Sequence, residues 1–199
     1  MSLWRGNALV LASKSEVRRN LLAAAGIPVI VDPADIDERG MEAKNAGLGP
    51  AEAALLLARE KALAVSRRRR GLVLGADQTL ALGERRFSKP TDRDAARAQL
   101  QSLAGHTHAL HSAAALARGG DILFEAVLTA RLSMRPLSDA FLDAYLADVG
   151  EHVTKSVGAY QLEGLGVHLF DKIEGDHFTV LGLPLLPLLA FFRKAGTLP

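Results

Sequence analysis

The stretch ALVLASKSEVRR, residues 8–19, decides the fold expected for this chain of 199 residues. Its first five residues are apolar and predict a short buried strand. Ser13 or Ser15 can cap the helix expected over residues 16–25, which ends at Gly26. A strand, a hydroxyl-rich turn and a helix in this order are typical of a mixed α/β sheet.

Apolar runs separated by turn residues predict the other elements. Strands are expected at residues 29–31, 72–76 and 167–173. Residues 80–87 are expected to form a turn with flanking strand, and residues 106–134 a long hairpin that turns at Gly119 and Gly120. Helices are expected at residues 50–70, from a capping signal at Thr91 to near Gly105, from a cap at Ser138 to Gly150, and from Pro184 onward. No long linker divides the chain, so we expect one domain over residues 1–199.

The composition excludes several classes of protein. The absence of cysteine excludes a disulfide scaffold, a thiol nucleophile and any metal site built on cysteine. A net charge of +2 lacks the basic excess of a nucleic-acid binder. The most apolar stretch, residues 178–192, is interrupted by two prolines and is shorter than the roughly 20 residues that span a bilayer. We therefore expect a soluble cytoplasmic protein with neither nucleic acid nor membrane as a partner.

Cations gather where the first helix begins. The N-terminus of a helix presents free N–H groups and the positive end of the dipole, so it binds phosphate. Lys14, Arg18 and Arg19 are unfavourable there unless an anionic ligand compensates for them. The alternative is an ordinary capped helix whose arginines reach solvent, and the local sequence leaves both open.

Two acidic features suit divalent metal or general-base chemistry. Asp77 is expected at the C-terminal end of the strand over residues 72–76, where α/β sheets place their ligands. Its carboxylate could hold a metal, activate water, or simply cap a turn. Residues 32–38 contain four carboxylates, which suit Mg²⁺ but are also common in solvated loops.

Two later segments offer groups for a phosphate and a base. Pro90 holds Lys89 extended, so its ammonium could face a phosphate or belong to an ordinary loop. In the glycine-rich residues 158–166, Glu163 could bind the edge of a base and Tyr160 could stack on it, or the segment is a plain connection.

Two other clusters are discounted. Arg67–Arg70 resemble a nucleic-acid patch, but their place at a helix end favours dipole compensation and solvation. His106 and His108 share one face of a strand without a third ligand nearby, so no metal site is expected there.

Taken in order, these segments resemble the Maf (septum-formation, Maf/HAM1-like) family of nucleoside triphosphate pyrophosphatases over nearly the whole chain. The resemblance rests on the Ala-Ser-x-Ser turn with its arginine pair and on residues 35–38, 59–62, 75–77, 89–90, 103–106, 158–160 and 181–185. It implies a Maf/ITPase-like fold, with an elongated mixed sheet, flanking helices and two lobes around a nucleotide cleft. It also implies an enzyme that hydrolyses a nucleoside triphosphate between the α- and β-phosphates, releasing the monophosphate and pyrophosphate, with Mg²⁺ or Mn²⁺.

The resemblance also implies roles for particular residues. Asp77 matches the proton acceptor, and Glu38 matches an acidic position of the metal site, to which Asp77 also contributes. The phosphate-binding positions are Ser13, Arg18, Lys61 and Lys89, and we add Lys14 from its place at the start of the helix. Members of the family often form dimers and are linked to cell division, so the resemblance allows a homodimer.

Three positions bear on the base. Gln78 after the aspartate and Glu163 in the late loop resemble the branch of the family that is active on 7-methyl-GTP. Val17 departs from that branch, which has tryptophan at this position, and from the pyrimidine branch, which has arginine. We expect removal of modified nucleotides such as 7-methyl-GTP. The alternatives are a dTTP/UTP pyrophosphatase of the same family and a non-catalytic nucleotide-binding regulator of cell division.

Overall fold

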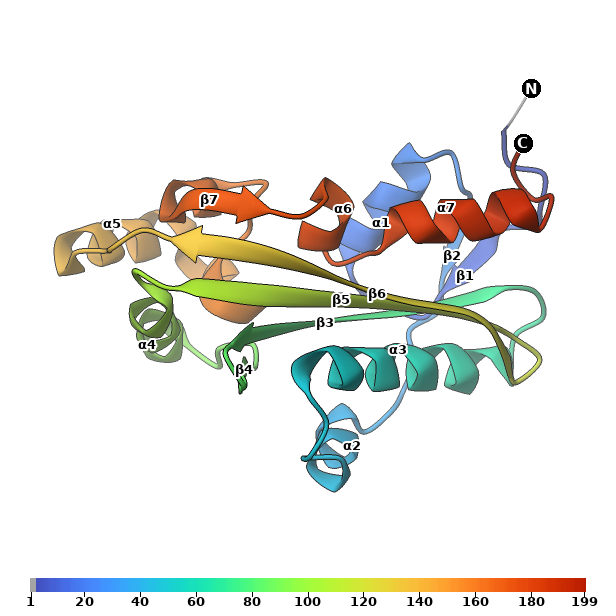
Figure 1. Ribbon diagram of the computed structural model, residues 1–199, viewed down its shortest axis with the longest axis horizontal. Helices are drawn as coiled ribbons and strands as arrows, with labels where there is room; N and C mark the ends of the chain where they lie inside the picture. The colour runs from blue at the N-terminus through green and yellow to red at the C-terminus, as the bar shows by residue number, and fades with distance from the viewer. Residues whose placement is uncertain (1–2) are drawn as a thin grey trace. The chain divides into compact units, whose positions relative to one another are not determined.

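The computed structural model describes residues 3–199, which form the expected mixed α/β fold (Figure 1). The strands are β1 (Leu9–Leu11), β2 (Val29–Val31), β3 (Val73–Leu82), β4 (Arg85–Phe87), β5 (Thr107–Arg118), β6 (Asp121–Met134) and β7 (Phe170–Glu174). The α-helices are α1 (Glu16–Ala24), α2 (Glu38–Lys44), α3 (Pro50–Ser66), α4 (Arg93–Leu103), α5 (Asp139–Val149), α6 (His177–Val180) and α7 (Leu185–Lys194). Three short 3₁₀ helices, η1 (Gly150–Thr154), η2 (Val157–Ala159) and η3 (Leu165–Leu169), lie between α5 and β7. The sheet has the order β2-β1-β3-β5-β6-β7, with β4 paired to β3.

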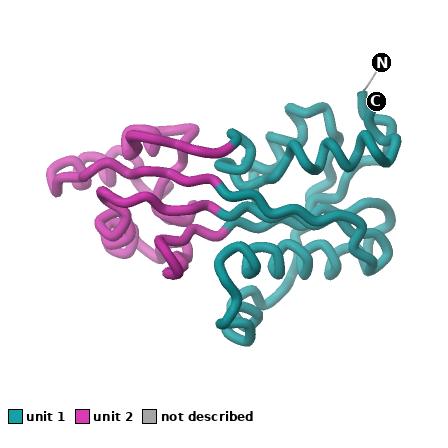
Figure 2. Tube along the Cα trace, in the orientation of Figure 1, with its two compact units in different colours: residues 1–78, 111–129, 176–199 teal, residues 79–110, 130–175 magenta. Residues whose placement is uncertain are grey.

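The chain divides into two compact units, coloured separately in Figure 2. The first unit contains the described residues up to 78 together with residues 111–129 and 176–199. The second contains residues 79–110 and 130–175. The expectation of one domain over residues 1–199 stays a prediction. In the part of the chain that the structure describes, no helix is both long enough and apolar enough to cross a membrane.

The first unit contains the parallel part of the sheet, which helices cover on both faces. β1 pairs in parallel with β2 and with β3, in a register that places Val10 opposite Val73. Helix α3 covers one face, and α1 and α7 cover the other (Figure 1). Because side chains alternate along a strand, Leu74 and Ala76 of β3 pack with α1 and α7, whereas Val73 packs with Val65 of α3.

Small residues let α3 lie directly against the sheet. Ala54, Ala58 and Ala62 of α3 share a core cluster with alanines of β5. Gly75 of β3 lies under the same helix, where an added Cβ would collide with the carbonyl oxygen of Ala58 and lie 2.6 Å from the amide nitrogen of Ala62. The glycine thus lets α3 approach the sheet closely. This close approach fixes the position on α3 from which the side chain of Lys61, the residue before Ala62, extends.

The second unit contains an antiparallel part of the sheet. β3 and β4 form a hairpin that turns at Gly83, with Leu80 opposite Phe87. β7 pairs antiparallel with β6, with Ile173 opposite Leu132. The side chain of Tyr160 is buried here.

Several local signals are confirmed. Ser15 caps α1 by accepting from the amide of Arg18, and Ser138 caps α5 by accepting from that of Phe141. The hairpin of β5 and β6 turns at Gly119 and Gly120, which both have positive φ angles. The helix expected after Thr91 is instead capped by Asp92, whose carboxylate accepts from the amide of Ala95.

Three boundaries differ from expectation, and one helix was not expected. β3 continues to Leu82, so Asp77 lies inside the strand rather than at its end, because pairing with β4 extends the strand. Helix α3 ends at Ser66 rather than near residue 70, and the chain turns through Arg67–Arg70 before Gly71. A helix that the sequence did not predict, α2, begins directly after its cap Asp37. The strand expected from residue 167 begins at residue 170, after η3.

Candidate active site

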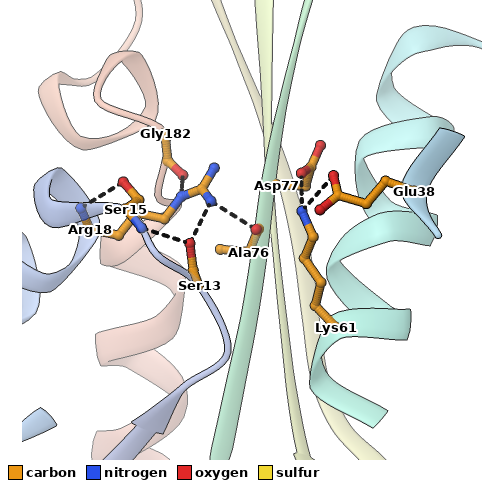
Figure 3. A network of polar contacts seen from close by, with 8 residues as sticks. All are labelled: Ser13, Ser15, Arg18, Glu38, Lys61, Ala76, Asp77 and Gly182. Carbon is orange, nitrogen blue, oxygen red and sulfur yellow. Dashed lines mark hydrogen bonds and ion pairs between the residues drawn. The ribbon is translucent and has the colours of Figure 1, made fainter. Parts of the chain in front are cut away.

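A nearly buried ion pair lies on the α3 face of the first unit. The ammonium nitrogen of Lys61, on α3, is 2.7 Å from Oδ1 of Asp77, on β3 (Figure 3). Only 11% of the Lys61 side chain and 14% of the Asp77 side chain are exposed. Charges with so little access to water are stable only when they are paired, so each group depends on the other for its orientation.

A second carboxylate shares the same lysine. Oε2 of Glu38 lies 3.1 Å from the Lys61 ammonium. Glu38 is the first residue of α2, and its placement follows from the Asp37 cap, which accepts from the amide of Gly40. Two carboxylates from separate elements therefore converge on one ammonium group.

Arg18 is held on the other side of β3 by oxygens of three segments. Its Nε donates to the carbonyl oxygen of Gly182 at 2.8 Å, and Nη1 donates to that of Ala76 at 2.8 Å and to the hydroxyl of Ser13 at 3.3 Å (Figure 3). Burial lowers the pKa of Arg18, and the negative charges of Asp77 and Glu38 oppose this effect.

The remaining donors of Arg18 have no such partner. Among residues 3–199, no acceptor within hydrogen-bond distance is found for Nη2. A guanidinium carries five N–H groups and remains charged in proteins. Two of its N–H groups are thus available to an anionic ligand, in a plane fixed by the other three contacts.

The structure gathers some of the expected site residues and not others. Ser13, Arg18, Glu38, Lys61 and Asp77 all belong to the network in Figure 3. The phosphate-binding role expected of Lys14, which is exposed just before the helix cap, and the specificity role of half-buried Val17 stay predictions. Lys89 and Glu163 are exposed in the second unit, and the phosphate-binding and specificity roles expected of them also stay predictions.

Gln78 and Tyr160 already have partners within the protein. The side-chain amide nitrogen of Gln78 donates to three oxygens of the first unit. Tyr160 is 6% exposed, and its hydroxyl is 2.7 Å from Nε2 of His108. The prediction that Tyr160 stacks on a base is therefore wrong, because its ring forms part of the core of the second unit.

The cluster of four carboxylates separates into different roles. Asp32 receives hydrogen bonds from Arg68 and Arg69, Asp37 caps α2, and Glu38 contacts Lys61. Arg68 and Arg69 are thus anchored to an aspartate rather than simply solvated. Among residues 3–199, no group of three or more histidine and carboxylate side chains is placed to hold a metal ion.

Sequence reasoning missed the groups that orient Arg18. Two of its acceptors are main-chain carbonyl oxygens, of Ala76 and Gly182, and a carbonyl carries no signature of its own in the sequence. One signal was available, because Gly182 lies within residues 181–185, one of the segments on which the family resemblance rests.

Comparison with known proteins identifies the family. Residues 8–195 match the profile of the family described as Maf-like protein, and the chain belongs to this family. A protein of Bradyrhizobium diazoefficiens named nucleoside triphosphate pyrophosphatase is 60% identical over 196 residues, covering 98% of this chain and 97% of the relative. A protein of Rhodopseudomonas palustris with the same name is 61% identical over 197 residues, with the same coverage. A protein of Mesorhizobium japonicum named 7-methyl-GTP pyrophosphatase is 51% identical over 193 residues, covering 96% of this chain and 97% of the relative.

Proposed function

We propose that this protein is a nucleoside triphosphate pyrophosphatase, an enzyme that hydrolyses the bond between the α- and β-phosphates. Water and the triphosphate give the nucleoside monophosphate and pyrophosphate. The observation that carries the proposal is the Lys61 ammonium held between Asp77 and Glu38, whose negative charges also act on Arg18, a guanidinium with Nη2 available to an anion. The names of the relatives from Bradyrhizobium and Rhodopseudomonas support the same reaction.

In this proposal, Asp77 accepts the proton of the attacking water. Lys61 holds Oδ1, and among the described residues no hydrogen bond is made to Oδ2, so that oxygen is available to water. Attack in line with the departing group then breaks the bond between the α-phosphorus and its bridging oxygen. Lys61 fixes the carboxylate in one orientation, which favours proton transfer at a single oxygen.

The cations bind the triphosphate and stabilise the leaving group. Nη2 of Arg18 offers two N–H groups in a fixed plane, which suits the oxygens of a phosphate. The hydroxyl of Ser13 accepts from Arg18 and from the Ser15 amide, and its own proton remains for a phosphate oxygen. We propose that the ammonium group of Lys14 adds positive charge against the departing pyrophosphate.

The carboxylates fit a divalent metal of the kind that nucleotide enzymes use. Mg²⁺ is usually held by one or two carboxylates and by substrate phosphates rather than by a complete protein cage. Glu38 and Asp77 supply two carboxylates that already converge on a cation, so these residues would hold Mg²⁺ or Mn²⁺. When bound, the metal would supply charge neutralisation on the phosphate oxygens and would lower the pKa of water.

The test is a panel of triphosphates that includes 7-methyl-GTP, GTP, dTTP and UTP, each with Mg²⁺ or Mn²⁺. The panel includes 7-methyl-GTP because the Mesorhizobium relative carries that name. Chromatography of the products distinguishes monophosphate with pyrophosphate from diphosphate with orthophosphate. Binding of a triphosphate without either product would instead favour the regulator, and release of orthophosphate would refute cleavage between the α- and β-phosphates.

The Asp77→Asn variant tests the catalytic residue. Loss of a general base reduces turnover by about 10²–10⁴-fold, and asparagine keeps the size of the side chain. The matched control is Asp171→Asn, at an exposed aspartate of β7. Wild-type turnover in Asp77→Asn would remove Asp77 from the mechanism.

The preferred base, the oligomeric state and the cellular location expected from the sequence stay predictions.

A further inference from the structure

Gln78 lies beside Asp77 on β3 but faces the opposite side of the sheet, toward α6 and β5. Its amide nitrogen Nε2 donates to the hydroxyl of Ser112 at 2.9 Å, to the carbonyl oxygen of Thr179 at 3.2 Å and to that of Val180 at 3.1 Å. Ser112 and Thr179 are fully buried. The amide nitrogen is fixed among these three oxygens, because turning it away would leave its two N–H groups without these partners.

The chemistry of these partners determines which way the Gln78 amide points. The two carbonyl oxygens can only accept hydrogen bonds. Ser112 gives its own proton to the carbonyl oxygen of Thr179, at 2.7 Å, so its oxygen must accept from Gln78. The nitrogen end of the amide therefore faces this cluster, and Nε2 is fully used within the protein.

The segment that Gln78 holds is the segment that holds Arg18. Thr179 also accepts from the amide of Gly182, at 3.1 Å, which closes the turn at the end of α6. Gly182 has a φ of +92°, and its carbonyl oxygen receives Nε of Arg18. A Cβ at Gly182 would lie 3.5 Å both from Nη2 of Arg18 and from Oε1 of Gln78, so the two side chains approach the same glycine.

We infer that Gln78 is a positioning residue for Arg18. By holding the turn from Thr179 to Gly182, it fixes the carbonyl oxygen of Gly182, one of the three oxygens that set the plane of the guanidinium. Nη2 is then presented to the phosphates of the substrate in one orientation. This inference rests on the proposed function and gives Gln78 a role independent of the base, in place of the specificity role expected from the sequence.

The first test compares Gln78→Met with wild type across the triphosphate panel. Methionine keeps an unbranched side chain of similar length and removes the donor. We expect kcat/KM to fall about tenfold, the equivalent of one or two hydrogen bonds, and to fall equally for every base because Arg18 contacts phosphate. The control is Gln101→Met, at an exposed glutamine of α4. An unchanged kcat/KM, or a loss confined to some bases, would overturn the inference.

The second test is a double-mutant cycle with Arg18→Ala. If Gln78 acts through Arg18, adding Gln78→Met to the Arg18→Ala variant changes kcat/KM by less than about twofold. If the two losses multiply, Gln78 contacts the substrate by itself and is not a positioning residue. Ser112→Ala provides a second route if Gln78→Met does not fold, because it removes another donor to Thr179 and should show the same dependence on Arg18.

The third test does not need turnover. Calorimetry with inorganic triphosphate measures the contribution of Arg18 to anion binding directly. We expect Gln78→Met to weaken the wild-type Kd about tenfold and to leave the Kd of Arg18→Ala unchanged. If wild type released no pyrophosphate, the proposed function would fail, but this arm would still decide whether Gln78 positions Arg18. Equal Kd values for wild type and Gln78→Met would reject the positioning role.

Discussion

The burial of His108, in the second unit, predicts that the free energy of unfolding falls as the pH is lowered. Its side chain is 1% exposed, with Nε2 at 2.7 Å from the hydroxyl of Tyr160. The rings of Tyr160 and Phe170 lie with centroids 5.7 and 5.8 Å from the imidazole. Burial in these apolar surroundings lowers the pKa of His108 from 6.5 to about 4. Among the described residues, Nδ1 has no hydrogen-bond partner, so nothing there stabilises a second proton.

The sign of the effect follows from which state binds the proton first. In the unfolded chain, His108 becomes protonated as the pH falls through 6.5, whereas the folded protein resists protonation down to about pH 4. Protonation therefore stabilises the unfolded state throughout this window, and the free energy of unfolding falls by the same amount. The gap between the two pKa values corresponds to a loss on the order of 3 kcal/mol by pH 4, and to almost none above pH 7.

The assay is urea unfolding of wild type and His108→Gln at pH values from 7.5 to 4. Glutamine can still accept from the Tyr160 hydroxyl but has no group that titrates in this range. Other titrating groups contribute equally to both proteins and cancel in the difference between their free energies of unfolding. We expect the wild type to lose on the order of 3 kcal/mol relative to the variant between pH 7 and pH 4. If the free energies of unfolding of the two proteins fell in parallel with pH, the reasoning would be refuted. The control is His168→Gln, at an exposed histidine, whose free energy of unfolding should follow that of the wild type.

Two further substitutions test how the site is held. Gly75→Ala should lower the free energy of unfolding by about 1–3 kcal/mol and reduce turnover, because the new methyl group displaces α3 and Lys61. Gly47→Ala, which meets no atom within 4 Å, is its control, and equal urea midpoints for the two variants would contradict the close approach of α3. Asp32→Asn should reduce kcat/KM by up to about fivefold, the range of an ion pair near the surface, because it loosens the segment that leads to Glu38. The measurement is steady-state kinetics, with Asp35→Asn, at an exposed aspartate, as the control. Equal kcat/KM values for the two variants would mean that other contacts hold that segment.

Local signals predicted much of the fold. Ser15 and Ser138 begin helices because their side chains satisfy amide groups of the first turn, which depends only on neighbouring residues. Gly119 and Gly120 form a hairpin turn because both adopt positive φ angles, which glycine adopts without strain. These elements depend on interactions within a few residues, and the sequence displays them directly.

Features that depend on distant partners were not predicted. The extension of β3 past Asp77 depends on pairing with β4. The end of α3 at Ser66 was not predicted either, because Gly71 marked the expected end and the contacts of Arg68 and Arg69 with Asp32 are not visible in the local sequence. Nothing in the neighbourhood of Gln78 indicates that Thr179, 101 positions away, accepts from its amide. The residues of the site were found from the order of the motifs, whereas the contacts that orient them required the fold.

The alternation of side chains along β3 has a consequence for how this protein can vary. Asp77 and Gln78 are neighbours in sequence, yet one contacts α3 and the other contacts the turn at the end of α6. The residue at one position can therefore be substituted without a direct clash at the other. Insertion or deletion of one residue ahead of Asp77 would instead exchange both faces together, turning the carboxylate toward Ser112 and the amide toward Lys61. A substitution here therefore disturbs one face of the strand, whereas a change in the length of the strand disturbs both.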